Sequence, residues 1–292
     1  MRKSKYLILS SFYFDFNNSL TEIKEIKTLF ENQNILDLFR FDKLISIKEK
    51  QFEEYNLNFI YLPKNIESLS EYTFMRKQIQ ILDLSNCIKL KNIEKRAFYK
   101  NQIKHLKLSE IIEKIDEGAF SENQIQILDL SNCIKLKNIG KRVFYENQIK
   151  QLKLPDNIEE IEWSAFLKNQ IKILDLSNCI KLKNIGEYAF IENQIKHLKL
   201  PKNIEIIGCS AFENNQIQIL DLSNCINLKV IYDNAFAGNP LKEIKILNNI
   251  NIRYYIYSED YLWTKFLLYY NDNGNKSGDY KLENNQWQWY PL

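Results

Sequence analysis

Cysteine and histidine are the residues of this sequence whose types and spacing could support metal binding, disulfide formation or nucleophilic chemistry. The chain of 292 residues holds five cysteines and two histidines. Four of the cysteines recur every 46 residues within the same heptapeptide, LDLSNCI; they are Cys87, Cys133, Cys179 and Cys225. Cys209 stands apart, and the histidines are His105 and His197. A zinc site or a nucleophilic site would need several of these groups in one place.

The rest of the sequence offers no catalytic motif. It contains no GxSxG, HExxH, GxxxxGK[ST] or paired CxxC. Seven glycines are few for a protein with phosphate-binding loops. Lys and Arg total 40 against 37 Asp and Glu, which excludes a strongly basic protein that coats nucleic-acid phosphates. We therefore expect no enzyme activity, no cofactor, no metal and no nucleic-acid partner.

An internal repeat defines the elements that position these residues. LDLSNCI alternates with IKHLKLSE, IKQLKLPD and IKHLKLPK, which begin at Ile103, Ile149 and Ile195. Phenylalanines recur with spacings that alternate between 22 and 24 residues, at positions 52, 74, 98, 120, 144, 166, 190, 212 and 236. A unit of this length cannot bury its apolar face alone, but a stack of copies can. The sequence therefore predicts an α/β repeat solenoid.

Each turn has one expected strand and one expected helical turn. The long turn reads Ile125, Leu128 and Leu130, then Ile139 and Phe144. Alternation around Leu-x-Leu is typical of a short strand. An isoleucine is followed four residues later by Ala or Val and five residues later by Phe. This spacing indicates one tight helical turn that faces inward.

These positions resemble the BspA-type class of leucine-rich repeats, whose pattern is L-x-x-L-x-L-P-x-x-I-x-x-I-x-x-x-A-F. The turn that ends at Phe212 matches it closely, with Leu198, Leu200, Pro201, Ile204, Ile207 and Ala211. The long turns depart from it, because they carry Ser-Asn-Cys where the family has proline. The resemblance covers residues 32–247. It implies a right-handed arc with one parallel sheet, used for protein interaction and without catalytic residues.

Both ends of the chain differ from the repeat. Residues 1–31 contain degenerate echoes of it and are expected to form an N-terminal cap. Residues 248–292 hold Trp263, Trp287 and Trp289 and predict a short helix, a turn and a final hairpin. A solenoid needs a terminal unit over its last core, so these aromatics are expected to form a cap. The alternative is that Trp287 and Trp289, two residues apart on one strand face, form an exposed platform for carbohydrate.

Within a solenoid the cysteines and histidines are too far apart to form a disulfide or a shared metal site. Equivalent residues of successive turns lie about 4.8 Å apart, so the four cysteines, in alternate turns, are spaced by about 9–10 Å. That distance excludes a disulfide, which needs Cα atoms within roughly 7 Å, and a shared zinc ion. We expect reduced, buried thiols beside Asn86, Asn132, Asn178 and Asn224, whose side chains should bond the backbone. His105 and His197 should be solvated strand residues.

Two columns of outward-facing residues form the candidate partner-binding surface. Beside the strand leucines one column alternates Asp with Lys, and the other carries isoleucine in every second turn. The residues are Ile81, Asp83, His105, Lys107, Ile127, Asp129, Gln151, Lys153, Ile173, Asp175, His197, Lys199, Ile219 and Asp221. A third column, from Glu67 to Lys229, alternates in sign too. Neighbouring charges cancel within a Debye length, which argues against nucleic acid. Repeated exposed isoleucine favours a protein partner.

Two function classes remain open from the sequence. One is a non-enzymatic scaffold that binds a protein through the concave strand face. The other is a cell-surface adhesin that binds a host or matrix protein or carbohydrate, with the aromatic C-terminal tail as a candidate binding segment. The segment MRKSKYLILSSFYFDF lacks a small-residue cleavage site, and free thiols suit a reducing compartment, so a cytoplasmic location is favoured over the cell surface. No apolar run is long enough to span a membrane.

Overall fold

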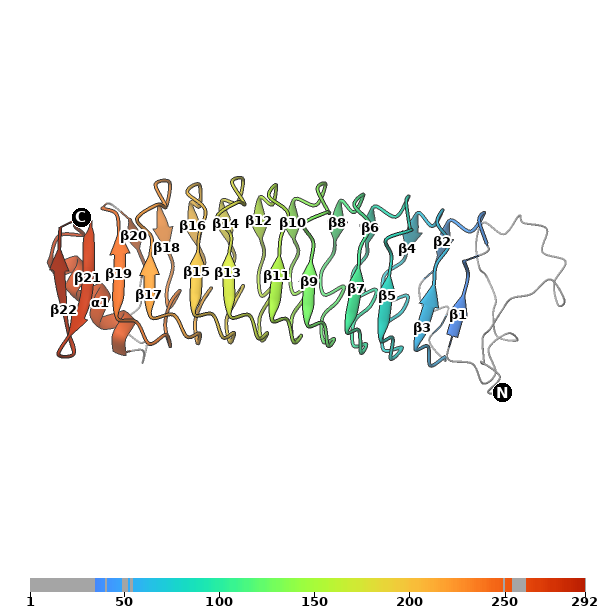
Figure 1. The fold of residues 1–292 in the computed structure, drawn as a ribbon, viewed down its shortest axis with the longest axis horizontal. Coiled ribbons are helices and arrows are strands. Elements are labelled where there is room, and N and C mark those ends of the chain that lie inside the picture. Colours follow the sequence, from blue (N-terminus) through green and yellow to red (C-terminus); the bar gives the residue numbers. More distant parts are fainter. Residues whose placement is uncertain are drawn as a thin grey trace, which may run out of the picture.

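The computed structural model describes residues 35–39, 41–48, 52, 55–248, 250–253 and 261–291. Over these residues the chain winds into a solenoid whose turns stack into an elongated rod (Figure 1). The N-terminal cap predicted for residues 1–31 lies outside the described residues.

A three- or four-residue strand from each turn lies along one side of the rod. These strands are β1 (Ile35–Asp37), β3 (Phe59–Tyr61), β5 (Ile81–Asp83), β7 (His105–Lys107), β9 (Ile127–Asp129), β11 (Gln151–Lys153), β13 (Ile173–Asp175), β15 (His197–Lys199), β17 (Ile219–Asp221) and β19 (Glu243–Ile246). The strand of each long turn pairs in parallel with that of the next short turn, as in Ile81↔His105 and Asp83↔Lys107. Alternation along each strand points its central residue inward, as predicted.

The other side of the rod carries a second set of parallel strands that the sequence did not predict. They are β2 (Ser46–Ile47), β4 (Ser68–Leu69), β6 (Asn92–Ile93), β8 (Lys114–Ile115), β10 (Asn138–Ile139), β12 (Glu160–Ile161), β14 (Asn184–Ile185), β16 (Ile206–Ile207), β18 (Val230–Ile231) and β20 (Asn251–Ile252). From β10 to β20 they pair without a break. Two residues are too few to show a period-two pattern, so only stacking reveals these strands.

The Ala-Phe segment forms hydrogen-bonded turns instead of the expected helical turn. Arg96 and Lys100, two residues before and after Phe98, both have positive φ, of 51° and 53°. With left-handed residues at these two positions, the amides of Arg96, Phe98 and Lys100 all donate to carbonyls of the next turn, at 2.9–3.0 Å. The same two positions have positive φ around each such phenylalanine from Phe74 to Phe236. The segment is therefore a third line of main-chain bonds between turns.

The core is a continuous column of phenylalanine rings. From Phe52 to Phe236 successive ring centroids lie 5.2–5.7 Å apart and the rings are close to parallel. Inward-facing leucines and isoleucines of both strand sets, such as Leu128 and Ile139, surround this column and are buried. The repeat that the sequence shows as spacing is thus a stack of identical core layers.

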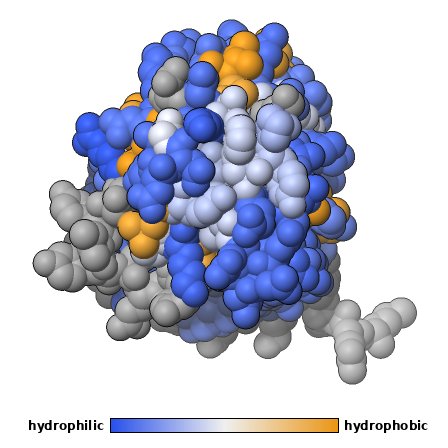
Figure 2. Space-filling view, turned by 90° about the vertical axis from the view of Figure 1, so that its left-hand side faces the viewer, coloured by the Kyte–Doolittle hydropathy of each residue, from blue (hydrophilic) through white to orange (hydrophobic). Residues whose placement is uncertain are grey.

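The C-terminal segment closes this stack. Helix α1 (Tyr261–Asp272) places Trp263 edge-on to Phe236, with centroids 5.2 Å apart. Strands β21 (Gly278–Glu283) and β22 (Gln286–Tyr290) form a hairpin, and β21 pairs antiparallel with β19. Seen from this end, the surface is mostly hydrophilic, with hydrophobic residues in separate spots (Figure 2). These are the features of a solenoid cap.

Candidate functional site on the strand face

The three-residue strands display the predicted columns on their outward face. The four isoleucines of this face, Ile81, Ile127, Ile173 and Ile219, are 48–62% exposed. The leucines between the two columns in the same strands, such as Leu128 and Leu174, are 1% exposed. His105, Gln151 and His197 stand in register with the isoleucines and are exposed. The structure thus brings together all fourteen residues of the predicted surface on one side of the rod.

Each aspartate of this face is held in place by a serine, and Asp83, Asp129 and Asp175 are also paired with a lysine. The Oδ1 atom of Asp129 accepts hydrogen bonds from the Ser131 amide, at 3.0 Å, and from the Ser131 hydroxyl. The Lys153 Nζ atom lies 3.5 Å from Asp129, and Lys199 stands equally close to Asp175. The serine hydroxyl bond is the main cause of the lowered pKa of Asp129 and of Asp175. Charge is therefore balanced locally along the face.

The third column shows the same local pairing. Lys91 pairs with Glu113 at 3.0 Å, and Lys137 with Glu159 at 3.2 Å. Glu205 lies between two lysines, Lys183 and Lys229. Because these pairs are solvent-exposed, each contributes little to stability. Their effect is to leave the rod without a large field of one sign.

The face continues into the C-terminal hairpin, which the sequence analysis missed. Antiparallel pairing places Glu243 opposite Lys281, and Lys245 opposite Asp279. The next pairing adds Gln288 and Tyr290 to the two columns. Sequence spacing gives no signal for this continuation, because the hairpin lies outside the repeat.

The tryptophans of the tail do not form the exposed platform of the adhesin hypothesis. Trp287 is 3% exposed, and its ring stands edge-on to Phe266 of α1 at 5.4 Å. Trp289 is partly buried, and its indole N–H donates to the Ser277 carbonyl at 3.1 Å. The platform prediction is wrong for Trp287, because this side chain belongs to the core of the cap.

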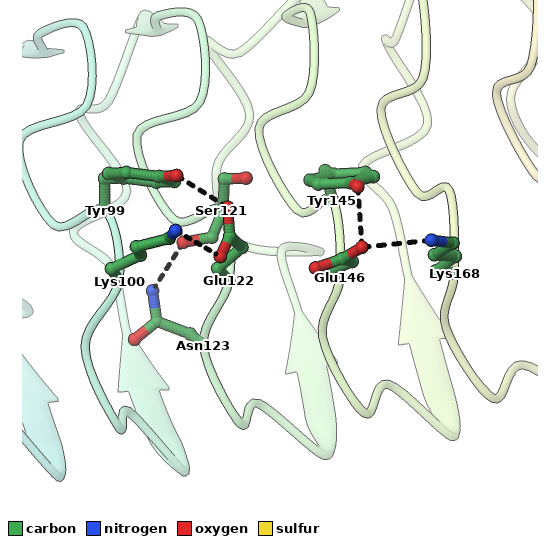
Figure 3. Close-up of polar contacts among 8 residues, drawn as sticks. All are labelled: Tyr99, Lys100, Ser121, Glu122, Asn123, Tyr145, Glu146 and Lys168. Carbon is green, nitrogen blue, oxygen red and sulfur yellow. Dashed lines mark hydrogen bonds and ion pairs between the residues drawn. The ribbon is translucent and has the colours of Figure 1, made fainter.

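A row of tyrosine, glutamate and lysine joins turns along another edge of the rod (Figure 3). The Tyr99 hydroxyl donates to Glu122 at 2.6 Å, and Lys100 lies 3.0 Å from the same carboxylate. Tyr145 donates to Glu146, and that bond is the main reason that the pKa of Tyr145 rises to about 12. These carboxylates are bound by partners from their own row. They therefore act as ties between turns, and no pair stands free for acid–base chemistry.

Comparison with known proteins identifies the repeat. The model of the BspA type leucine rich repeat region, in 6 copies, matches residues 21–138 and 137–263. The chain belongs to this family. No significant match was found among curated proteins.

Three solved structures resemble the BspA-type chain, all at low identity. The pneumococcal vaccine antigen PcpA has 19% identity and a TM-score of 0.49, over 80% of this chain and 69% of the antigen. A leucine rich cell surface protein from Faecalibacterium prausnitzii A2-165 has 16% identity and a TM-score of 0.48, over 82% of this chain and 91% of that protein. A leucine-rich repeat protein from Bacteroides ovatus ATCC 8483 has 15% identity and a TM-score of 0.46, over 82% of this chain and 75% of that protein.

The BspA-type repeats bury the recurring cysteines as inert thiols. Cys87, Cys133, Cys179 and Cys225 are free and buried, and Cys209 is partly buried. Burial raises the pKa of Cys133 and of Cys179 to about 11. Within the described part of the chain, no group of three or more His, Cys, Asp or Glu side chains could hold a metal ion. The same residues include no helix long and apolar enough to cross a membrane.

The buried asparagines of the BspA-type repeats are a set that the sequence analysis missed. Asn86, Asn132, Asn178 and Asn224, which were expected to bond the backbone of the connector, are exposed, and their side chains make no backbone hydrogen bond in the described structure. The buried asparagines stand three residues after each column phenylalanine from Phe98 to Phe236: Asn101, Asn123, Asn147, Asn169, Asn193, Asn215 and Asn239. The recurring Asn-Gln-Ile, present in all but the last of these turns, was the available signal.

A second row of exposed isoleucine also escaped the sequence analysis. Ile88, Ile134, Ile180 and Ile226, the last residues of the LDLSNCI copies, are 55–68% exposed. They follow the strand in the connector, so they stand apart from the strand face. The isoleucine recurs at the end of each heptapeptide. The connector shows no alternation of apolar and polar residues, however, so the sequence did not indicate whether its side chain faces the core or the solvent.

Proposed function

We propose that this chain is a non-enzymatic scaffold that binds a protein partner through the outward face of strands β5 to β19. The observation that carries the proposal is the row of four isoleucines, which begin the strands of alternate turns and are more than two fifths exposed. Because the isoleucines lie in alternate turns, neighbouring isoleucines of the row are about 9.6 Å apart. Solvent-exposed apolar side chains in a regular row mark an interaction surface.

The charges beside this row favour protein over nucleic acid. Every aspartate from Asp83 to Asp175 has a lysine of the next turn within 4 Å, so neither sign dominates. Nucleic acid would require unbalanced positive charge along one face. A protein interface, by contrast, commonly has an apolar centre with a polar rim. The isoleucine row and the Asp–Lys column have this arrangement.

A double substitution with a matched control tests the proposal. Ile127→Ser with Ile173→Ser removes the centre of the row, whereas Ile134→Ser with Ile180→Ser changes equally exposed isoleucines in the connector. Proteins captured by the wild-type chain are identified and purified, and their affinity for each variant is measured. We expect at least about a tenfold loss for the first variant and little change for the second. Equal loss in both would contradict binding through this face, as would an unchanged affinity in the first.

A further inference from the structure

The outermost strand of the C-terminal sheet lacks the charged residues that protect such edges. The sheet order is β17-β19-β21-β22, so β22 is its outer strand among the residues that the structure describes (Figure 1). β17, β19 and β21 each carry charged residues, but β22, with the sequence QWQWY, carries none. An edge strand without charge, proline or bulge is a template for pairing with another strand.

The register of the hairpin defines which main-chain groups lie on this free edge. The Leu282 amide donates to the Lys242 carbonyl at 2.8 Å, so the even-numbered residues of β21 bond toward β19. The odd-numbered residues, opposite Gln286, Gln288 and Tyr290, therefore bond toward β22. It follows that the amides and carbonyls of Trp287 and Trp289 point away from β21.

We propose that β22 pairs antiparallel with β22 of a second copy of this chain, about a two-fold axis at Gln288. In this register Trp287 and Trp289 of one copy exchange hydrogen bonds with Trp289 and Trp287 of the partner subunit, which gives four main-chain bonds. Gln288 faces Gln288 of the partner subunit, and Gln286 faces the partner's Tyr290. No charged residue faces its own copy, so the edge is self-complementary.

This pairing goes beyond the proposed function. A two-fold axis perpendicular to the sheet joins the two rods end to end and turns both strand faces to the same side. The isoleucine column already continues through Lys281 and Gln288, and the Asp–Lys column through Asp279 and Tyr290, so both would then extend across the two copies. The dimer would present two equivalent binding faces to a partner.

Sedimentation equilibrium on the full chain tests the pairing. We expect a monomer–dimer equilibrium, and Gln288→Lys should weaken it at least about fivefold, because it opposes two like charges at the axis. Gln288→Glu should do the same, and an equimolar mixture of the two variants should dimerise again. Leu268→Lys, on an exposed position of α1, is the control and should leave the dimer unchanged.

Amide exchange followed by mass spectrometry supplies the second measurement. Protection of residues 286–290 should rise with protein concentration in the wild-type chain and not in Gln288→Lys. A chain that stays monomeric up to several hundred micromolar overturns the proposal. A dimer whose affinity in both Gln288→Lys and Gln288→Glu equals that of the wild-type chain overturns it too, and points to a different interface.

Discussion

At the scale of single residues, the buried asparagines determine how one turn joins the next. The Oδ1 atom of Asn169 accepts from the Ile149 amide at 3.0 Å, and its Nδ2 group donates to the carbonyls of Phe144 and Phe166. Only an amide side chain supplies an acceptor and two donors at so short a reach. Alanine would leave buried main-chain groups unpaired, and aspartate would have no donors for the carbonyls.

Replacing one asparagine therefore has a defined cost. We expect Asn169→Ala to lower the free energy of unfolding by about 2–3 kcal/mol, because it orphans buried amide and carbonyl groups. The exposed Asn178→Ala should change it by less than about 0.5 kcal/mol. Urea denaturation of both variants measures the difference. Equal effects would mean that burial of Asn169 contributes nothing specific.

The cysteines provide a second prediction at this scale. Burial raises the pKa of the thiols of Cys87, Cys133 and Cys179 to about 11, so at pH 8 very little thiolate is present in the folded chain. We expect a disulfide reagent at pH 8 to modify the less buried Cys209 first and the others only after unfolding in urea. Mass spectrometry of peptides from timed samples locates the modified sites. Early labelling of Cys133 would show that the repeats open locally.

At the scale of elements, no turn is stable by itself. A turn of 22 or 24 residues offers one phenylalanine ring, two short strands and one Ala-Phe segment with left-handed residues. The strands and the Ala-Phe segment make main-chain hydrogen bonds to the neighbouring turns, and the ring stacks on the rings of those turns. Folding free energy therefore arises at the interfaces between turns. The phenylalanine column is the apolar part of that interface.

Phe166 tests this account. Its ring stacks on Phe144 at 5.5 Å and on Phe190 at 5.2 Å, and it is fully buried. Phe166→Ala should destabilise the chain by about 3–5 kcal/mol through loss of burial and the cavity left in the stack. Phe166→Leu, which refills most of that space, should cost clearly less. Chemical denaturation compares the two, and an unchanged midpoint for alanine would remove Phe166 from the core.

At the scale of the whole molecule, the rod is neutral along its length and closed at its C-terminal end. The charged columns pair turn by turn, so opposite charges along the described sides screen one another. The end is different, because stacked turns expose their apolar interior wherever the stack stops. Trp263, Phe266, Tyr280 and Trp287 cover that interior and turn polar residues outward.

Removal of the cap should consequently affect the whole rod. A chain that ends at Leu247 exposes the ring of Phe236 and leaves β19 without its partner β21. We expect a lower thermal midpoint and self-association, measured by calorimetry and size-exclusion chromatography. Leu268→Ser, which changes an exposed residue of the cap, is the control. A truncated chain that elutes as a monomer and melts like the wild type would show that the cap is dispensable.

The sequence alone determined the solenoid and the direction of its strand side chains. The spacing of the phenylalanines defines the turn length, and alternation in ILD and HLK defines which residues face out, because both are local properties repeated many times. For the same reason the solvated positions of His105 and His197 and the burial of the recurring cysteines were predicted correctly.

Only the tertiary structure decided the features that depend on neighbouring turns. The left-handed residues around Phe98, the second strand set and the role of Asn169 are stabilised by bonds to other turns, and a single turn carries no pattern long enough to reveal them. Likewise, the spacing of Trp287 and Trp289 predicts that both lie on one face of a strand, but it does not indicate which residues cover that face. The packing of α1 against that face buried Trp287, and the pairing of β21 with β19 carried the strand face to β22.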